Sequence, residues 1–212
     1  MKLRIKDLGL IAYSEAYQMQ KEHVEHVLNG QEQILLLCEH PAVLTLGRLT
    51  NEAHMFLSES ELKTRGVDVQ RIDRGGDITL HAPGQLVVYP ILNLNNFGKD
   101  LHLYLRQLEE VAIDLLKDFD IVAHRFSSRT GVWVEERKIV SIGIGVRKWI
   151  SFHGLALNVT TDLSLFSLIR PCGLDVSMTS LAQIKGSFVD MEDVKNKMVN
   201  HFCKNFKLNN SL

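Results

Sequence analysis

Apolar residues recur at helical spacing in three long stretches of the chain. Between Leu101 and Phe119 they step by three and four positions, which places them on one face of an amphipathic helix. The same spacing predicts helices from Tyr13 to Leu28 and from Asp190, a suitable N-cap, to about Phe206. A shorter helix is expected after Ser58, because Ser58 and Glu61 form a capping-box pattern.

Shorter apolar runs without helical spacing predict strands. These runs are Ile34 to Cys38, Ala42 to Leu46, Val67 to Ile72, Leu86 to Leu92, Ile121 to His124, Gly131 to Glu135, Ile139 to Val146, and Ile150 to Val159. Strands outnumber helices in the middle of the chain and often follow one another directly. This order favours an α+β fold, with a mixed, largely antiparallel sheet packed with helices, over strict alternation of strands and helices. With 212 residues and neither a repeat nor a linker, one domain is expected over residues 1–212.

Composition narrows the classes of protein that fit. The formal net charge is -1, so no global field attracts nucleic acid or an anionic membrane. We see neither a signal peptide nor an apolar run of roughly 20 residues, the length of a membrane span, and expect a cytoplasmic protein. The three cysteines, Cys38, Cys172 and Cys203, are too widely spaced for a zinc motif or a disulfide framework. No metal and no membrane or nucleic-acid partner is therefore expected.

The segment from Arg74 to Gln85 is the first candidate site. Its glycines at Gly75-Gly76 allow a close backbone approach to a ligand, and Thr79 and His81 can both form hydrogen bonds. A glycine-rich hairpin with a surface arginine is an equal alternative from composition alone. The segment lacks the spacing of a phosphate-binding loop.

Cys172 is the candidate nucleophile, because a proline and a glycine flank it in the sequence RPCG. A buried structural cysteine is the alternative, and we favour that role for Cys38 and Cys203. Lys138 opens a strand-like run and is a candidate base. His81 and His153, which have glycine-rich neighbours, make a cysteine–histidine pair the rival arrangement.

Four segments together resemble the lipoyl(octanoyl) transferases of the lipoate-protein ligase B type. They are EHPAVLTLGR from Glu39, RGGDITLHAPGQLVVYPI from Arg74, GVWVEERKIVSIGIGVRKWISFHGLALNV from Gly131, and PCGLDVSMTSL from Pro171. The resemblance implies the fold of biotin- and lipoate-protein ligase catalytic domains, with Cys172 as nucleophile and Lys138 as its base. It implies a substrate pocket made by Arg74, Gly75, Gly76, Asp77, Ile78, Thr79, Leu80, His81, Ser141, Ile142, Gly143, Gly154, Leu155 and Ala156, with His153 as a supporting residue.

The resemblance also implies a reaction. An octanoyl group would pass from octanoyl-acyl carrier protein to a thioester on Cys172, and then to a lysine of a lipoyl domain. The expected acceptors are the lipoyl domains of 2-oxoacid dehydrogenase complexes and the glycine cleavage H protein, with no ATP and no metal.

Two departures concern the pocket. Leu80 stands where the family usually has an aromatic residue, and Ala82 where it usually has glycine. Two other functions stay open at this point: an ATP-dependent lipoate- or biotin-protein ligase, and a binding module without enzymatic activity.

Overall fold

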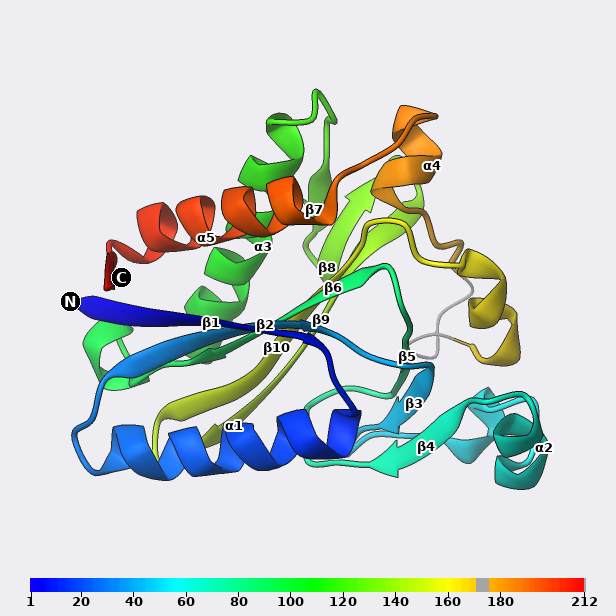
Figure 1. Cartoon of the computed structure of the whole chain (residues 1–212), viewed down its shortest axis with the longest axis horizontal. Helices are drawn as coiled ribbons and strands as arrows, with labels where there is room; N and C mark the ends of the chain where they lie inside the picture. The colour runs from blue at the N-terminus through cyan, green and yellow to red at the C-terminus, as the bar shows by residue number, and fades with distance from the viewer. Residues whose placement is uncertain (171–175, 212) are drawn as a thin grey trace.

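The computed structural model describes residues 1–170 and 176–211, and within them an eight-stranded sheet forms the centre of the molecule (Figure 1). Its strands lie in the order β11-β1-β2-β6-β10-β9-β8-β7. Their bounds are β1 (Lys2–Leu10), β2 (Gln33–Glu39), β6 (Gln85–Ile91), β7 (His124–Phe126), β8 (Arg129–Val134), β9 (Arg137–Arg147), β10 (Ile150–Asn158) and β11 (Asn209–Ser211). β1 is parallel to both of its neighbours, β2 and β11. Every other neighbouring pair in this order, from β2-β6 to β8-β7, is antiparallel. The predicted α+β class is confirmed.

Helices cover both faces of this sheet (Figure 1). On one face, α3 (Leu101–Lys117) and α5 (Met191–Phe206) pack over a core that includes Leu86 and Val88 of β6. On the other face, α1 (Tyr13–Leu28) covers Val87 and Tyr89, the alternate residues of the same strand. β6 is buried on both faces for this reason, and its sequence reads as a continuous apolar run.

A second, three-stranded sheet has the order β4-β3-β5 and lies beside the α1 face (Figure 1). It contains β3 (Val43–Leu46), β4 (Asp68–Arg71) and β5 (Ile78–His81), with β3 parallel to β4 and antiparallel to β5. Its apolar residues form a separate cluster with Leu62 of α2 (Glu59–Thr64) and Phe166 of η3 (Leu163–Leu168). The remaining short helices are η1 (Glu52–His54), η2 (Leu94–Phe97) and α4 (Leu181–Lys185).

Most predicted elements agree with the structure, and one strand was wrong. The strand expected from Ile121 to His124 begins only at His124 and runs to Phe126. Val122 is 87% exposed, so this apolar residue marks a surface connection after α3 and not a buried strand. The capping box of Ser58 and Glu61 at the start of α2 is confirmed. None of the helices in the described part of the chain combines the length and the apolar character that crossing a membrane requires.

Candidate active site

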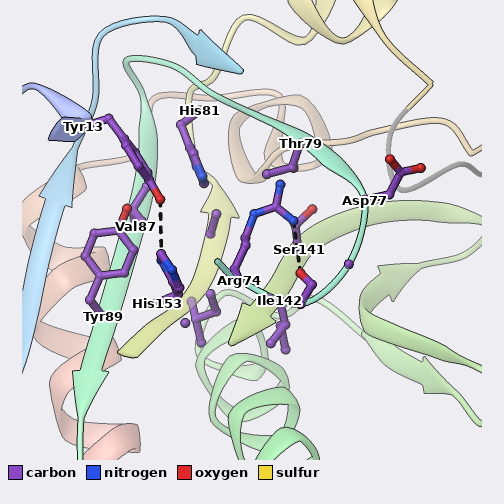
Figure 2. A pocket seen from close by; sticks show the side chains of 16 residues that line it. Tyr13, Arg74, Asp77, Thr79, His81, Val87, Tyr89, Ser141, Ile142 and His153 are labelled. Carbon is purple, nitrogen blue, oxygen red and sulfur yellow. Dashed lines mark hydrogen bonds between the residues drawn. The ribbon is translucent and has the colours of Figure 1, made fainter. Parts of the chain in front are cut away.

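A pocket lies between the two sheets, and residues from distant parts of the chain line it (Figure 2). Its lining comes from the loop before β5, from β5 itself, from the three adjacent strands β6, β10 and β9, and from the first residue of α1. The side chains and backbone that border it belong to Tyr13, Arg74, Gly75, Gly76, Asp77, Thr79, His81, Val87, Tyr89, Ser141, Ile142, Gly143, His153, Gly154, Leu155 and Ala156. The pocket thus joins three segments that the sequence analysis singled out separately.

Ile78 and Leu80 do not border the pocket. β5 alternates, so Thr79 and His81 face the pocket, whereas Ile78 and Leu80 pack into the cluster around Leu62. Both apolar side chains are fully buried there. The Leu80 departure from the family pattern therefore lies in the small core behind the pocket.

Arg74 holds the glycine turn at one end of the pocket through hydrogen bonds. Its Nη2 donates to the Thr45 carbonyl at 2.5 Å and to Thr45 Oγ1 at 2.9 Å, and its Nη1 donates to the Gly75 carbonyl at 3.1 Å. The Gly75 N–H in turn donates to the Ile144 carbonyl at 2.8 Å, which ties the turn to β9. Gly47 allows this turn to approach, since a Cβ there would lie 2.4 Å from the Gly76 carbonyl oxygen.

Aromatic and imidazole rings close the opposite end of the pocket. Tyr13 lies with its ring centroid 5.3 Å from that of His40 and 6.0 Å from that of His81, and its hydroxyl is 3.5 Å from His153 Nδ1 (Figure 2). Tyr89 joins them through a 2.8 Å hydrogen bond between its hydroxyl and His40 Nε2. Burial raises the pKa of Tyr13 and Tyr89, so both hydroxyls keep their protons.

Asp73 orients His153 from outside the pocket. Its Oδ1 accepts a hydrogen bond from His153 Nε2 at 3.0 Å and another from the Tyr17 hydroxyl at 2.7 Å. The bond from His153 is the main cause that lowers the pKa of Asp73 to about 2. Burial lowers the pKa of His153 itself, which fits a neutral ring with its proton on Nε2. His153 has φ +55°, a strained conformation that the surrounding contacts must maintain.

A buried chain of hydrogen bonds connects His81 to the segment after residue 175. Burial lowers the pKa of His81 to about 3, so the ring is neutral and Nδ1 donates to Gln85 Oε1 at 2.7 Å. Gln85 Nε2 donates to Asn158 Oδ1 at 2.9 Å, and Asn158 Nδ2 donates to the Thr179 carbonyl at 3.0 Å. Because the chain ends on a backbone carbonyl, the orientation of both amides is fixed.

Lys138 borders a second cavity that adjoins the pocket. The two share Gly75, Gly76, Asp77, Ile142 and Gly143 in their linings. Lys138 is only 2% exposed, and its Nζ lies 5.2 Å from the centre of the Trp133 ring. The Lys138 N–H donates to the Ser177 carbonyl at 2.9 Å, and the Lys138 carbonyl accepts from the Thr179 N–H at 2.9 Å.

Cys172 lies outside the described residues, but the chain on both sides of residues 171–175 is anchored at this cavity. Before them, the Arg170 N–H donates to the His54 carbonyl at 2.8 Å. After them, Ser177 and Thr179 pair with Lys138 as described above. His54 also lines the cavity, and its Nδ1 is hydrogen-bonded to Asp77 Oδ2.

The sequence analysis missed Tyr13, Val87 and Tyr89 in the pocket and His54 in the cavity. The first three lie in apolar helix and strand patterns, where they are indistinguishable from core residues. His54 is the last residue of the short helix η1, which no sequence pattern predicted, and it has no glycine-rich neighbours. Among the described residues, no group of His, Cys, Asp and Glu side chains is arranged to hold a metal ion.

Comparison with known proteins relates this chain to one family of enzymes. The model of the lipoyl protein ligase A/B catalytic domain matches residues 12–203. The octanoyltransferase of Syntrophotalea carbinolica is 50% identical over 202 residues, which are 94% of this chain and 92% of that protein. The octanoyltransferase of Bacteroides fragilis is 47% identical over 93% of this chain and 95% of its own length.

Solved structures share the fold at lower identity. A lipoate-protein ligase A bound with ATP has a TM-score of 0.78 and 17% identity, and the match covers 100% of this chain and 90% of that one. The biotin protein ligase of Aquifex aeolicus, in complex with biotin and ATP, has a TM-score of 0.60 and 17% identity over 96% of this chain and 70% of its own. The expected fold of biotin- and lipoate-protein ligases is thereby confirmed.

Proposed function

This chain belongs to the lipoyl protein ligase A/B family and is an octanoyltransferase, and from that premise we propose a two-step transfer through Cys172. The octanoyl group passes from the thioester of octanoyl-acyl carrier protein to the Cys172 sulfur, and from there to a lysine amine of a lipoyl domain. The acceptors are the lipoyl domains of 2-oxoacid dehydrogenase complexes and the glycine cleavage H protein, and the reaction takes place in the cytoplasm.

Lys138 is the base in both steps. In the first step, Lys138 takes the Cys172 proton, the thiolate attacks the thioester, and the departing carrier thiolate receives that proton from Lys138. In the second step, Lys138 takes a proton from the attacking lysine amine, the bond to Cys172 breaks, and the cysteine thiolate regains the proton. Atoms and charges balance, and the conversion of a thioester into an amide is favourable without ATP.

One observation carries the assignment of Lys138. A lysine that is 2% exposed borders the cavity next to the acyl pocket, and its backbone pairs with the residues just after 171–175. Burial of an amine at the edge of this cavity favours a role in proton transfer over a solvated surface role.

The other two cysteines support Cys172 by contrast. Cys38 is fully buried in β2, and burial raises its pKa well above the ordinary value for a thiol. Cys203 lies on α5, and burial raises its pKa as well. Neither thiol is suited to supply a thiolate near neutral pH. His81 and His153, the rival bases, lie at the ring-lined end of the pocket, away from the cavity that contains Lys138.

Intact mass spectrometry tests this function. We expect the protein, mixed with octanoyl-acyl carrier protein in the absence of ATP, to gain one octanoyl group that hydroxylamine removes. Cys172→Ala should lose the adduct, and Cys38→Ala and Cys203→Ala should retain it. An adduct on Cys172→Ala would contradict the covalent route. Transfer that requires ATP and free octanoate would show a ligase instead.

A further inference from the structure

We propose that Tyr13, Tyr89 and His153 form an end wall of the acyl pocket that sets the length of the transferred chain at eight carbons. This inference rests on the proposed function and identifies the part of the pocket that selects its substrate. The three residues lie outside the two strips Ser141–Gly143 and Gly154–Ala156 and outside the Arg74–His81 segment.

The direction of the tail follows from the two cavities. The pocket and the Lys138 cavity meet at Gly75, Gly76 and Gly143, so the reacting carbonyl belongs at that end. Figure 2 shows Tyr13, Tyr89 and His153 on the left of the pocket and Asp77 on the far right. The terminal methyl group of a bound acyl chain therefore faces the three rings.

A trough of small residues leads from one end to the other. Gly143 of β9 lies opposite Gly154 of β10, and Ser141 lies opposite Ala156. Ala156 lies in turn opposite Val87 of β6. The tail thus crosses β9 and β10 over residues with little or no side chain, and it reaches Val87 on β6, the strand that also carries Tyr89.

The length of this trough matches an octanoyl chain. Adjacent strands lie about 4.8 Å apart, so the distance from β9 to β6 is about 9.6 Å. An extended polypeptide advances about 3.5 Å over three backbone bonds, or about 1.2 Å per bond, so the seven C–C bonds of octanoyl span about 8 Å. This span already includes the terminal methyl carbon, and the remaining ~1.6 Å is shorter than the ~2.4 Å that two further methylenes would need.

Hydrogen bonds and a second row of rings keep the wall in place. The Tyr89 hydroxyl is bonded to His40 Nε2, and His40 Nδ1 is bonded to the Ile11 carbonyl at 2.7 Å. The backbone N–H of His153 donates to Gln20 Oε1 at 2.8 Å. The Tyr13 hydroxyl is directed at His153 Nδ1, so the polar atoms of the wall face one another. Displacement of these rings by a longer acyl chain would therefore break buried hydrogen bonds and ring contacts.

Chain-length selectivity tests the wall. The measurement is kcat/KM for hexanoyl-, octanoyl-, decanoyl- and dodecanoyl-acyl carrier protein, with transfer to a lipoyl domain followed by mass. We expect Tyr13→Ala to raise the ratio of decanoyl to octanoyl transfer by at least about tenfold, because two methylenes then fit where the ring was. Tyr13→Phe, which keeps the ring, should leave the ratio unchanged.

Tyr104→Ala is the matched control. Tyr104 is a buried tyrosine of α3 that packs in the core on the other face of the large sheet, and it does not line the pocket. A ratio that Tyr13→Ala leaves unchanged, or that Tyr104→Ala raises equally, would overturn the proposal that the wall sets the chain length. Absence of octanoyl transfer by the unmodified protein would instead contradict the proposed function. Calorimetric Kd values of free octanoic and decanoic acids test the wall independently of the transfer reaction. Tyr13→Ala should raise the affinity for decanoic acid relative to octanoic acid by at least about tenfold.

Discussion

Gly131 makes room for the side chain of Lys138. A Cβ at Gly131 would lie 2.7 Å from Lys138 Cε and 3.3 Å from Nζ, and also 2.6 Å from the Val140 carbonyl oxygen. The Gly131 N–H donates to Oε1 of Glu109, a carboxylate that is 1% exposed, so the glycine cannot move away freely. The position of the lysine amine therefore depends on a residue that carries no functional group.

Gly131→Ala should lower the rate of octanoyl transfer about 100-fold, because displacement of a catalytic group by about 1 Å has an effect of that size. Single-turnover transfer measures this rate. Gly131 has φ +130° and would also be strained by a side chain. Gly186→Ala is the control for strain, since Gly186 has φ +63° and nothing within 4 Å of the added Cβ. Equal loss of transfer in the two variants would mean that Gly131 acts through the fold alone.

Lys138→Met should lower the transfer rate by roughly 10²–10⁴-fold, the usual contribution of a general base. His54→Gln should lower the transfer rate less than tenfold, because Lys138 and not His54 is the base. The comparison matters because His54, oriented by Asp77, borders the same cavity. The rate of Cys172 alkylation by iodoacetamide, measured against pH, provides a second readout. A larger loss with His54→Gln than with Lys138→Met would assign the base to the histidine.

The elements that the sequence predicted well are those whose periodicity reflects burial. α1 and α3 each present one apolar stripe to a sheet, and β10 is buried along its whole length. β1 was missed because charged residues interrupt its apolar residues. β1 lies near the edge of the large sheet, where charged side chains reach solvent. β5 was missed because two glycine turns flank it and hide its alternation.

Two parts of the pocket lining were named from the sequence, on different grounds. The glycines and hydrogen-bonding residues of the segment from Arg74 to His81 marked it as a candidate, whereas the strip around Gly143 came from the family resemblance alone. The pocket is lined by residues of both, although Ile78 and Leu80 of the first segment face away from it. Tyr89 and Val87 were not named from the sequence, because a strand that is buried on both faces gives no sign of which residue faces a pocket and which a core. That distinction depends on the strand order β6-β10-β9, a long-range property of the fold.

The stability of the folded protein should fall as the pH falls from about 6.5 toward 3. Burial lowers the pKa of His81 from 6.5 to about 3, and it also lowers the pKa values of His40 and His153. In this window the unfolded chain binds protons that the folded chain excludes, so stability is complete above the upper limit and is lost below it. His81→Gln should reduce the dependence by up to about 1.4 kcal/mol per pH unit. Urea unfolding at a series of pH values measures the slope, and an unchanged slope would show that His81 is protonated in the folded state.

Asn158→Leu should destabilise the fold by about 2–4 kcal/mol. The substitution removes two hydrogen bonds at a position that is 1% exposed. Gln85 Nε2 keeps only its 3.3 Å bond to the Leu80 carbonyl, and the Thr179 carbonyl loses the Asn158 donor. Each buried group with an unmet hydrogen bond costs about 1–3 kcal/mol. Thermal unfolding should show a Tm lower by several degrees, since about 1 kcal/mol corresponds to roughly 2–4 °C for a chain of this size. Asn196→Leu, at an exposed position of α5, is the control and should change Tm little.

The same variant should also slow octanoyl transfer beyond its effect on stability. Thr179 is bonded through its carbonyl to Asn158 and through its N–H to the Lys138 carbonyl, so loss of the amide loosens the residues that pair with Lys138. Transfer is to be measured at a temperature where the variant is fully folded by circular dichroism. Asn158→Asp retains an acceptor for Gln85 but loses the donor to Thr179, and it should therefore remain slow. Transfer at the full rate by folded Asn158→Leu would show that the hydrogen-bonded chain stabilises the fold without positioning the active site.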